Sequence, residues 1–421
     1  MCLLKPEYDG NGLPVAESQL ALFDYVTELL RSGKAVSAYT PGMGGVAEAV
    51  MKMAFGNGFG FDFDSTLTME ELFGLCYGSF VLEMSGEAEG KVLGQITDRG
   101  AFTYGAETVD AQKLQKEYED KLESVYTCNI ADVSTPVENV SYKAGVKAAP
   151  AVKTAKPKVL IPVFPGTNCE YDSAKAMEDA GAEAEIFVIR NLTADAIAES
   201  VEQFARKLST SQMVFIPGGF SGGDEPDGSG KFITAFFRNA AVKEQVENLL
   251  ERRDGLMLGI CNGFQALIKL GLVPYGKILD ADAEFPTLTH NVIGRHQSRL
   301  VRTRVASNLS PWLSGTKVGD VFTVPISHGE GRFLADEALV RELAAKGQIA
   351  TQYVDLEGNA TTDVHFNPNG SIFAIEGITS PDGRVLGKMG HSERKGNGLY
   401  KNVPGEFDMK LFESAVRYFK G

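Results

Sequence analysis

A cysteine at position 261 lies between two glycines, in the stretch Gly259-Ile260-Cys261-Asn262-Gly263. An apolar run precedes it, and a stretch with helical periodicity follows. Such a strand-to-helix corner exposes a nucleophile, and glycines are needed there because larger side chains would collide at so sharp a turn. The positive end of the helix would favour a thiolate, and its first backbone amides could bind an oxyanion. The pattern predicts a cysteine nucleophile; the alternative is a buried, inert cysteine.

A cysteine nucleophile needs a base, usually a histidine that a carboxylate orients. Two of the five histidines have a glutamate two residues later, in His328-Gly329-Glu330 and in His391-Ser392-Glu393. On an extended segment, residues i and i+2 point to the same side, so either glutamate could orient its imidazole. Spacing alone does not choose between the pairs. The strand-like VFTVPIS before His328 slightly favours His328 over His391, which lies in a polar, glycine-rich stretch.

The segments around Cys261 alternate between strand-like and helix-like patterns. Short apolar runs at 158–164, 213–219 and 255–260 are typical of parallel strands covered on both faces. Their alternation with helical stretches predicts an α/β fold with a doubly wound, mostly parallel sheet. Ligands of such sheets bind at the carboxyl ends of the strands. The glycine-rich loop PGGFSGGD, residues 217–224, follows one of these strands and could supply a second oxyanion donor.

The chain before this region has a different organisation. It mixes helices and strands without regular βαβ units, which predicts a smaller α+β domain. Residues 143–158, KAGVKAAPAVKTAKPK, have no hydrophobic periodicity and indicate an exposed linker. We therefore expect a domain at 1–130, a linker at 131–157 and the α/β domain at 158–421.

Composition and charge exclude several classes of protein. The formal net charge is −14, so nucleic acids and anionic membranes are poor partners. No apolar run approaches the roughly 20 residues that a membrane span needs. The first residues, MCLLKPEYDGNG, lack the apolar stretch of a signal peptide. Five widely spaced cysteines without a CxxC pair indicate a reducing cytoplasm, with neither disulfides nor a metal site.

Two other signals are weak. FDFDSTL, residues 61–67, is similar to the start of haloacid-dehalogenase-type phosphatases, but it lacks the buried strand that this motif needs before it. Thr68 and Glu71 instead predict a helix capping box. Cys169 follows Gly-Thr-Asn at the end of the first strand, but no second glycine comes after it. We therefore expect Cys169 to have a packing role.

Several stretches resemble a known family. GICNGFQAL, PGGFSGGD and SHGEGRF together resemble the class I (triad) glutamine amidotransferases, whose fold is flavodoxin-like. VLIPVFPGTNCEYDSAKAMEDAGAEAE, HNVIGRHQSRL and KMGHSERKG resemble more closely the glutaminase domain of phosphoribosylformylglycinamidine (FGAM) synthases. This resemblance covers nearly all of residues 157–421.

The resemblance implies a role for each matching residue. Cys261 attacks the side-chain amide of glutamine, His328 is the general base and then the acid for the leaving ammonia, and Glu330 orients His328. The backbone amides near Gly218 and Gly219 and that of Asn262 form the oxyanion hole. The side chain of Gln265 helps to hold the substrate.

The N-terminal region resembles another part of the same enzymes, the second C-terminal subdomain of the synthetase half, which aminoimidazole ribonucleotide synthetases share. Many relatives carry a stretch like AHDVSDGGL where this chain has Ala38–Val46. The histidine and both aspartates are missing, but the glycine pair remains as Gly44 and Gly45. We therefore expect a phosphate-facing glycine turn without the polar side chains.

The ATP-binding synthetase domains of the larger family form have no counterpart in this sequence. The resemblance thus implies a C-terminal part or a split subunit that supplies ammonia to a synthetase, which converts formylglycinamide ribonucleotide to its amidine in purine biosynthesis. The expected partners are glutamine and the synthetase part, and ATP and Mg²⁺ are expected there, with no cofactor in this chain. The alternatives are a stand-alone cysteine hydrolase with the same sheet and a non-catalytic docking fragment.

Overall fold

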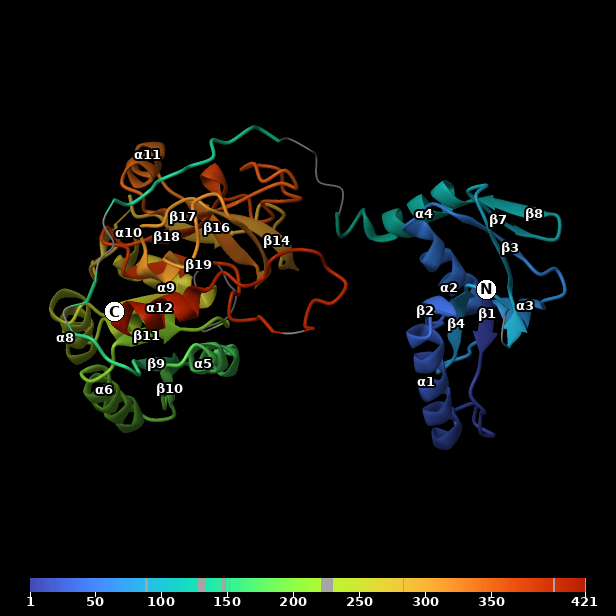
Figure 1. The fold of residues 1–421 in the computed structure, drawn as a ribbon, viewed down its shortest axis with the longest axis horizontal. Coiled ribbons are helices and arrows are strands. Elements are labelled where there is room, and N and C mark those ends of the chain that lie inside the picture. Colours follow the sequence, from blue (N-terminus) through green and yellow to red (C-terminus); the bar gives the residue numbers. More distant parts are fainter. Residues whose placement is uncertain are drawn as a thin grey trace. The chain divides into compact units, whose positions relative to one another are not determined.

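The computed structural model describes residues 1–87, 90–127, 134–145, 149–150, 152–220, 230–282, 284–396 and 398–420. The chain divides into two compact units, unit 1 (Met1–Asn129) and unit 2 (Ile130–Gly421), each of which has its own sheets (Figure 1). In the described part of the chain, no helix is both long and apolar enough to cross a lipid bilayer.

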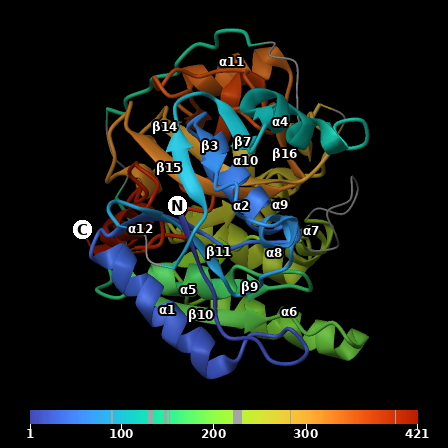
Figure 2. The ribbon, with the colours of Figure 1, turned by 90° about the vertical axis from the view of Figure 1, so that its right-hand side faces the viewer.

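Unit 1 is an α+β unit with two four-stranded sheets, as expected. The first has the order β2-β4-β1-β5 and is antiparallel. The second has the order β6-β3-β7-β8, and its strands β3 and β7 lie side by side in parallel (Figure 2). The strands are β1 (Cys2–Leu4), β2 (Ala35–Tyr39), β3 (Gly60–Phe63), β4 (Phe80–Met84), β5 (Lys91–Val92), β6 (Gly94–Thr97), β7 (Ala101–Tyr104) and β8 (Glu107–Asp110). The helices are α1 (Ala16–Arg31), α2 (Gly45–Phe55), α3 (Met69–Phe73), α4 (Ala111–Glu119) and the 3₁₀ helix η1 (Asp120–Leu122).

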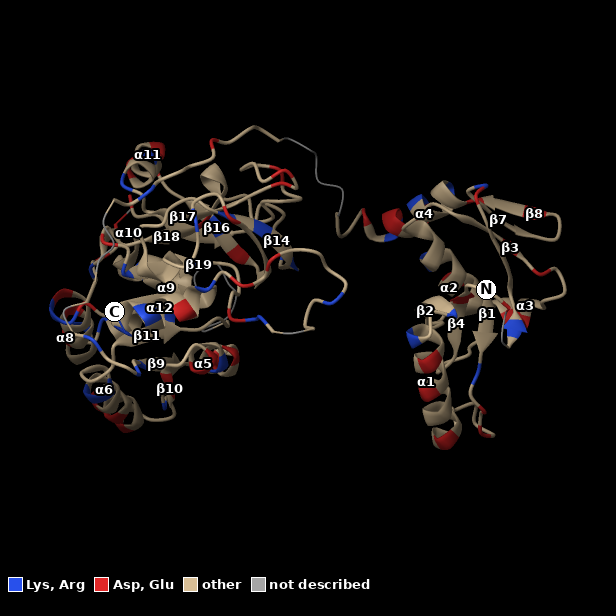
Figure 3. Ribbon diagram, in the orientation of Figure 1, with Lys and Arg blue, Asp and Glu red and all other residues tan. Residues whose placement is uncertain are grey.

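Local sequence explains how the helices of unit 1 form. Helix α1 buries Leu22, Val26 and Leu29, whose spacing places them on one face. The predicted capping box at the start of α3 is confirmed: the Thr68 side chain accepts a hydrogen bond from the Glu71 amide, and the Glu71 carboxylate accepts one from the Thr68 amide. Acidic residues outnumber basic ones in this unit, and several lie along α1 (Figure 3).

Unit 2 is built around a nine-stranded sheet with the order β10-β9-β11-β12-β19-β18-β17-β14-β15. The strands from β10 to β19 in this order pair in parallel, and the remaining strands extend the sheet in antiparallel pairs. The expected α/β class is confirmed. The strands are β9 (Lys158–Val163), β10 (Glu183–Val188), β11 (Met213–Ile216), β12 (Leu256–Ile260), β14 (Gln297–Val305), β15 (Val321–His328), β17 (Ile349–Tyr353), β18 (Ile375–Thr379) and β19 (Val385–Lys388); β13 (Thr287–His290) and β16 (Glu330–Leu334) form a separate antiparallel pair.

The helices of unit 2 form two groups, as expected for a doubly wound sheet. Helices α5 (Glu170–Asp179) and α12 (Leu411–Lys420) contact each other. A second series of contacts joins α6 (Ala194–Leu208), α8 (Ala240–Glu247), α7 (Lys231–Phe237) and α9 (Asn262–Leu270). Strands β11 and β12 are buried along their whole length, which explains their uninterrupted apolar sequences. The other elements are α10 (Leu272–Tyr275), α11 (Glu337–Ala345), the π-helix η2 (Asn248–Arg252) and the 3₁₀ helices η3 (Pro311–Leu313) and η4 (Ile372–Ala374).

The segment that we expected to be an exposed linker follows the surface of unit 2 where it is described. The amide of Val140 donates a hydrogen bond to the Gln352 side chain at 2.9 Å. Farther along, the amide of Tyr142 donates to the Ala306 carbonyl at 2.8 Å, and Val140 itself is buried. These two residues precede 143–158, where most of the described residues are exposed. The parts at 131–133, 146–148 and 151 lie outside the described residues.

Helix α9 packs so closely on the sheet that two positions must be glycine. A methyl group on Gly259 would lie 2.6 Å from the carbonyl oxygen of Gly263. One on Gly263 would overlap the carbonyl oxygen of Ile216, at the end of β11. Because both obstacles are backbone atoms, they cannot move aside as a flexible side chain would. The glycines that flank Cys261 thus allow α9 to begin directly against β11 and β12.

We predict that Gly263→Ala destabilises the protein, because the added methyl group must push α9 away from the sheet. The expected loss is about 2–4 kcal/mol in the free energy of unfolding, measured by urea denaturation. Gly396→Ala is the control, since a methyl group there meets no atom within 4 Å. A loss below about 0.5 kcal/mol in Gly263→Ala, which is usual for a surface substitution, would contradict the close approach.

Candidate functional site

Cys261 lies at the corner between β12 and α9, where the sequence predicted an elbow. Its backbone has φ 52° and ψ −107°, and the residue is 3% exposed. Positive φ is uncommon for residues other than glycine, and such strain persists only where the surrounding structure holds it. The Cys261 amide donates to the Lys388 carbonyl at 2.9 Å, and the sulfur lies 3.8 Å from the Ser327 carbonyl oxygen. The thiol is therefore held at the carboxyl edge of the parallel strands.

A buried imidazole–carboxylate pair lies beside this thiol. His391 Nδ1 and Glu393 Oε1 are 2.6 Å apart. The imidazole and Cys261 both pack against Gly218, because a methyl group on Gly218 would lie 2.6 Å from His391 Cε1 and 3.4 Å from Cys261 Cβ. Since Nδ1 is engaged with Glu393, Nε2 is the nitrogen that remains to act on the Cys261 thiol.

The charge on His391 suits it to act with a thiol. Burial alone lowers the pKa of His391, but the charge of Glu393 and hydrogen bonds with Cys169, Cys261 and Glu393 outweigh burial and raise this pKa well above 6.5. This shift favours the protonated form of the imidazole. An imidazolium favours a neighbouring thiolate and can protonate a leaving amine. Cys261, His391 and Glu393 together can carry out nucleophilic attack on an acyl carbon.

His328 and Glu330 do not form the pair that we expected. Strand β15 ends at His328 and β16 begins at Glu330, so the rule that residues i and i+2 share a face does not apply across the break. The Glu330 carboxylate lies 3.8 Å from His290 Nδ1, and the ring nitrogens of His328 have no hydrogen-bond partner among the described residues. A methyl group on Gly331 would come within 2.5 Å of the His328 ring.

The protonation of His328 also argues against its expected role. Burial, followed by the charges of His391 and His296, lowers the pKa of His328 to about 3. A base with so low a pKa accepts protons weakly at neutral pH. The structure therefore favours His391 with Glu393, the alternative that spacing had left open.

The other expected site residues of unit 2 lie on two segments. Gly218 and Gly219 follow Pro217 after the end of β11, and Asn262 and Gln265 lie in the first turn of α9. Gln265, which we expected to hold the substrate, uses its side chain within the wall of the site: it donates to the Glu330 carbonyl at 2.6 Å and accepts from Asn262 Nδ2 at 2.7 Å. The rest of the glycine-rich loop, residues 221–229, lies outside the described part of the chain.

A second thiol, Cys169, lies against the same imidazole. Its sulfur is 3.9 Å from His391 Nδ1, and Arg394 donates a hydrogen bond to this sulfur at 3.2 Å. Cys169, His391 and Glu393 form a group in the described part of the chain whose donor atoms, all within 4.8 Å of one another, could hold a metal ion. The Arg394 guanidinium opposes a second cation at this place. From the sequence we expected Cys169 only to pack. Its position just before α5 resembles that of Cys261 just before α9, and this likeness could have indicated that Cys169 lies at the site.

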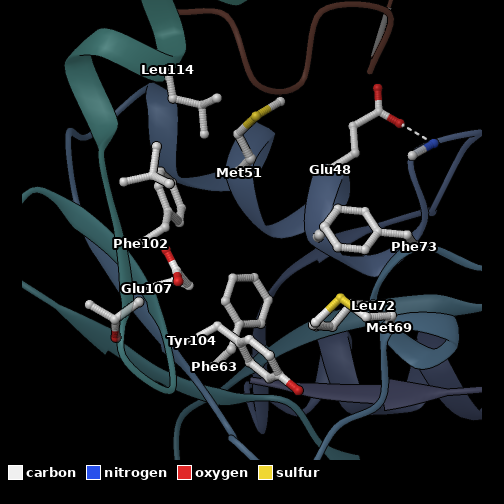
Figure 4. Close-up of a pocket in the computed structure, with 14 residues that line it drawn as sticks. Glu48, Met51, Phe63, Met69, Leu72, Phe73, Phe102, Tyr104, Glu107 and Leu114 are labelled. Atoms are coloured by element: carbon white, nitrogen blue, oxygen red, sulfur yellow. Dashed lines mark hydrogen bonds between the residues drawn. The ribbon is translucent and has the colours of Figure 1, made fainter.

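The glycine pair of unit 1 does not face a phosphate as we expected. The Gly44 amide donates to the Glu48 carboxylate at 2.8 Å, and the Gly45 amide donates to the Gly42 carbonyl at 3.1 Å. A carboxylate thus occupies the start of α2, where an anion would bind. The adjoining pocket, of about 450 Å³, is walled by apolar side chains such as Met51 and Phe73 and by no lysine or arginine among the described residues (Figure 4). Its residues do not fit a nucleotide phosphate.

Comparison with known proteins agrees with the geometry of unit 2. Residues 156–419 match the model of the CobB/CobQ-like glutamine amidotransferase domain. The chain belongs to this family. This amidotransferase is similar to phosphoribosylformylglycinamidine synthase subunit PurQ of Methanococcus maripaludis, with 35% identity over 289 residues, covering 62% of this chain and 98% of the relative. The same subunit of Gloeobacter violaceus is 34% identical over 259 residues, covering 62% and 97%.

A solved structure of PurLQS from Thermotoga maritima is also similar to the amidotransferase. The identity is 26% and the TM-score is 0.45, with 63% of this chain and 100% of that chain covered.

We predict that His391, rather than His328, activates Cys261. His391→Gln should slow alkylation of Cys261 by iodoacetamide at pH 7 about 10-fold or more, because the thiolate reacts and the imidazolium favours it. The matched His328→Gln variant should react within about twofold of the wild type. The rate is followed by mass spectrometry of the peptide that contains residue 261. The opposite ranking of the two variants would restore His328 as the partner of the thiol.

We also predict that His328 destabilises the fold in acid. Its folded pKa of about 3 is below the unfolded value of 6.5, so the unfolded state binds more protons as the pH falls below 6.5. At pH 5 this group alone lowers the free energy of unfolding by about 2 kcal/mol. His391 has the opposite sign: its stabilisation is complete below pH 6.5 and is lost as the pH rises through its raised folded pKa.

Urea unfolding at pH 7 and pH 5 measures the effect of His328. The wild type should lose about 2 kcal/mol more over this interval than His328→Gln does. Equal losses in the two proteins would show that the His328 pKa is not depressed in the folded state.

Proposed function

We propose that this chain hydrolyses glutamine at Cys261 and delivers the ammonia to a synthetase that makes formylglycinamidine ribonucleotide, in purine biosynthesis. The observation that carries the proposal is the strained thiol of Cys261 beside the buried His391–Glu393 pair, in a unit of the glutamine amidotransferase family. The PurQ relatives support the choice of pathway, since they are subunits of phosphoribosylformylglycinamidine synthase and the chain covers nearly all of their length.

Each residue of the site has a role in the proposed reaction. The Cys261 thiolate attacks the side-chain carbonyl carbon of glutamine, and the His391 imidazolium gives its proton to the leaving nitrogen, which departs as ammonia. Water then attacks the thioester while His391 accepts a proton, which releases glutamate and restores the thiolate and the imidazolium. Glu393 holds the imidazolium in place. We propose that backbone amides near Gly218, Gly219 and Asn262 stabilise the tetrahedral oxyanion.

The ammonia must reach its acceptor without entering bulk water, where it would be protonated to ammonium and lose its nucleophilic lone pair. We therefore propose that the chain works with ATP-binding synthetase domains, either in a longer polypeptide or in a separate subunit. ATP and Mg²⁺ belong to that synthetase part. In unit 1, the Glu48 carboxylate at the start of α2 and the apolar pocket beside it do not favour binding of a nucleotide phosphate at that place.

Two cysteines lie beside the His391 imidazole, so replacing each one separately shows which of them is the nucleophile. We predict that Cys261→Ala lowers the rate of glutamate release from glutamine at least about 1000-fold, because no nucleophile remains at the elbow. Cys169→Ala should keep activity within about fivefold of the wild type, since its sulfur only flanks His391. Full activity in Cys261→Ala, or loss confined to Cys169→Ala, would reject Cys261 as the nucleophile.

We further predict weak glutaminase activity in the chain alone. Glycine-rich loops need packing to fix their conformation, and the expected oxyanion loop is rich in glycine. Adding a synthetase subunit, with ATP and formylglycinamide ribonucleotide, should raise glutamate release and produce the amidine. Vigorous hydrolysis by the chain alone, unchanged by a synthetase, would favour a stand-alone hydrolase instead.

A further inference from the structure

A buried ion pair lies directly behind the segment that carries His391. Lys388, the last residue of β19, and Glu376, in the neighbouring strand β18, are 1% and 0% exposed, and Lys388 Nζ lies 3.1 Å from Glu376 Oε1. Burying two charges requires their removal from water, and an apolar pair of similar volume is often at least as stable. The pair therefore calls for an explanation other than stability.

The Lys388 ammonium also donates two hydrogen bonds to the segment around His391. Nζ donates to the Gly390 carbonyl at 2.9 Å and to Ser392 Oγ at 3.1 Å. These acceptors are the residues on either side of His391 in the sequence. The ammonium thus fixes the backbone before the imidazole and the side chain after it.

Glu376 holds the same peptide from its other end. Its Oε1 accepts a hydrogen bond from the Gly390 amide at 2.6 Å, and its Oε2 accepts one from the Thr351 hydroxyl. No room is left for movement at Gly390, since a methyl group there would lie 2.6 Å from Val324 and 3.0 Å from Glu376 Oε1. Both hydrogen-bonding groups of one residue next to His391 are therefore bound by the two members of one ion pair.

Lys388 is also joined to the nucleophile. Its backbone carbonyl accepts the hydrogen bond from the Cys261 amide, and strands β12 and β19 pair in parallel with Ile260 opposite Lys388. One residue therefore binds the backbone of Cys261 through its main chain and the neighbours of His391 through its side chain. We infer that the Lys388–Glu376 pair is a positioning device that sets the His391 imidazole at its working distance from the Cys261 thiol.

This inference rests on the proposed function for its meaning in catalysis, but the geometry can be tested without glutamine. None of the side-chain hydrogen bonds recorded for the pair goes to the thiol or the imidazole, so its removal should change how often the two are aligned. Binding of glutamine should change little, because no hydrogen bond of the pair reaches Gly218, Gly219 or Asn262. A positioning role therefore predicts a fall in kcat at unchanged KM.

The main test uses the double variant Lys388→Met, Glu376→Gln in the full chain. Both charges disappear together, so no unpaired buried charge remains, and the glutamine side chain can still accept from the Gly390 amide. We expect the rate of Cys261 alkylation by iodoacetamide at pH 7 to fall about 10-fold, and kcat for glutamine to fall by a similar factor at unchanged KM. The matched control is Arg384→Met, which removes a cation that is paired with Asp254 and Asp382 just before β19 begins; both rates should stay within about twofold.

The inference is overturned if the double variant folds and its alkylation rate equals that of the wild type. Should the double variant fail to fold, Ser392→Ala decides, because it removes one acceptor of Lys388 without burying a new charge. We expect alkylation about two- to fivefold slower in Ser392→Ala, and an unchanged rate would overturn the inference. Failure of the proposed function is a separate result: the wild type would release no glutamate from glutamine, while the ranking of the alkylation rates would remain.

Discussion

The strained backbone at Cys261 is the constraint on which the rest of the site depends. A residue with φ 52° can join β12 to α9 only if the helix begins against the sheet, and the helix can do so only because positions 259 and 263 carry no side chain. The close approach brings the end of β11 next to the thiol, so Gly218 becomes a shared neighbour of Cys261 and His391. Substituting any of these glycines would displace the nucleophile from its partner.

Buried charges then make the thiol at this corner suitable for nucleophilic attack. The site has two buried ion pairs, His391 with Glu393 and Lys388 with Glu376, and Lys388 comes shortly before His391 in the chain. In so dry an environment each charge interacts strongly with its partner, and an unpaired one would be very unfavourable. In the first pair, the charge of Glu393 raises the pKa of the imidazole beside the thiol. The second pair donates and accepts hydrogen bonds at the residues next to His391. Buried charges therefore both set the protonation of the imidazole and hold the backbone that carries it.

The two units differ in what their residues can do. Unit 2 gathers titratable side chains at the carboxyl edge of a parallel sheet, where strand ends and helix starts meet. Unit 1 has an apolar pocket and an acidic composition, and the start of its α2 is already occupied by the Glu48 carboxylate. The side chains suited to amide hydrolysis thus lie in unit 2, the part that matches the amidotransferase family.

The sequence by itself determined the α/β class, the elbow at Cys261 and the family, because these depend on local periodicity and on contiguous motifs. It did not determine the base: His328-Gly329-Glu330 and His391-Ser392-Glu393 have the same spacing. Only the tertiary structure separated the two, since the ring nitrogens of His328 have no hydrogen-bond partner among the described residues, while His391 is hydrogen-bonded to Glu393 beside the thiol. The sequence also did not predict that Lys388 pairs with Glu376. Side chains on neighbouring strands come together through strand pairing and burial, which a local sequence pattern does not show.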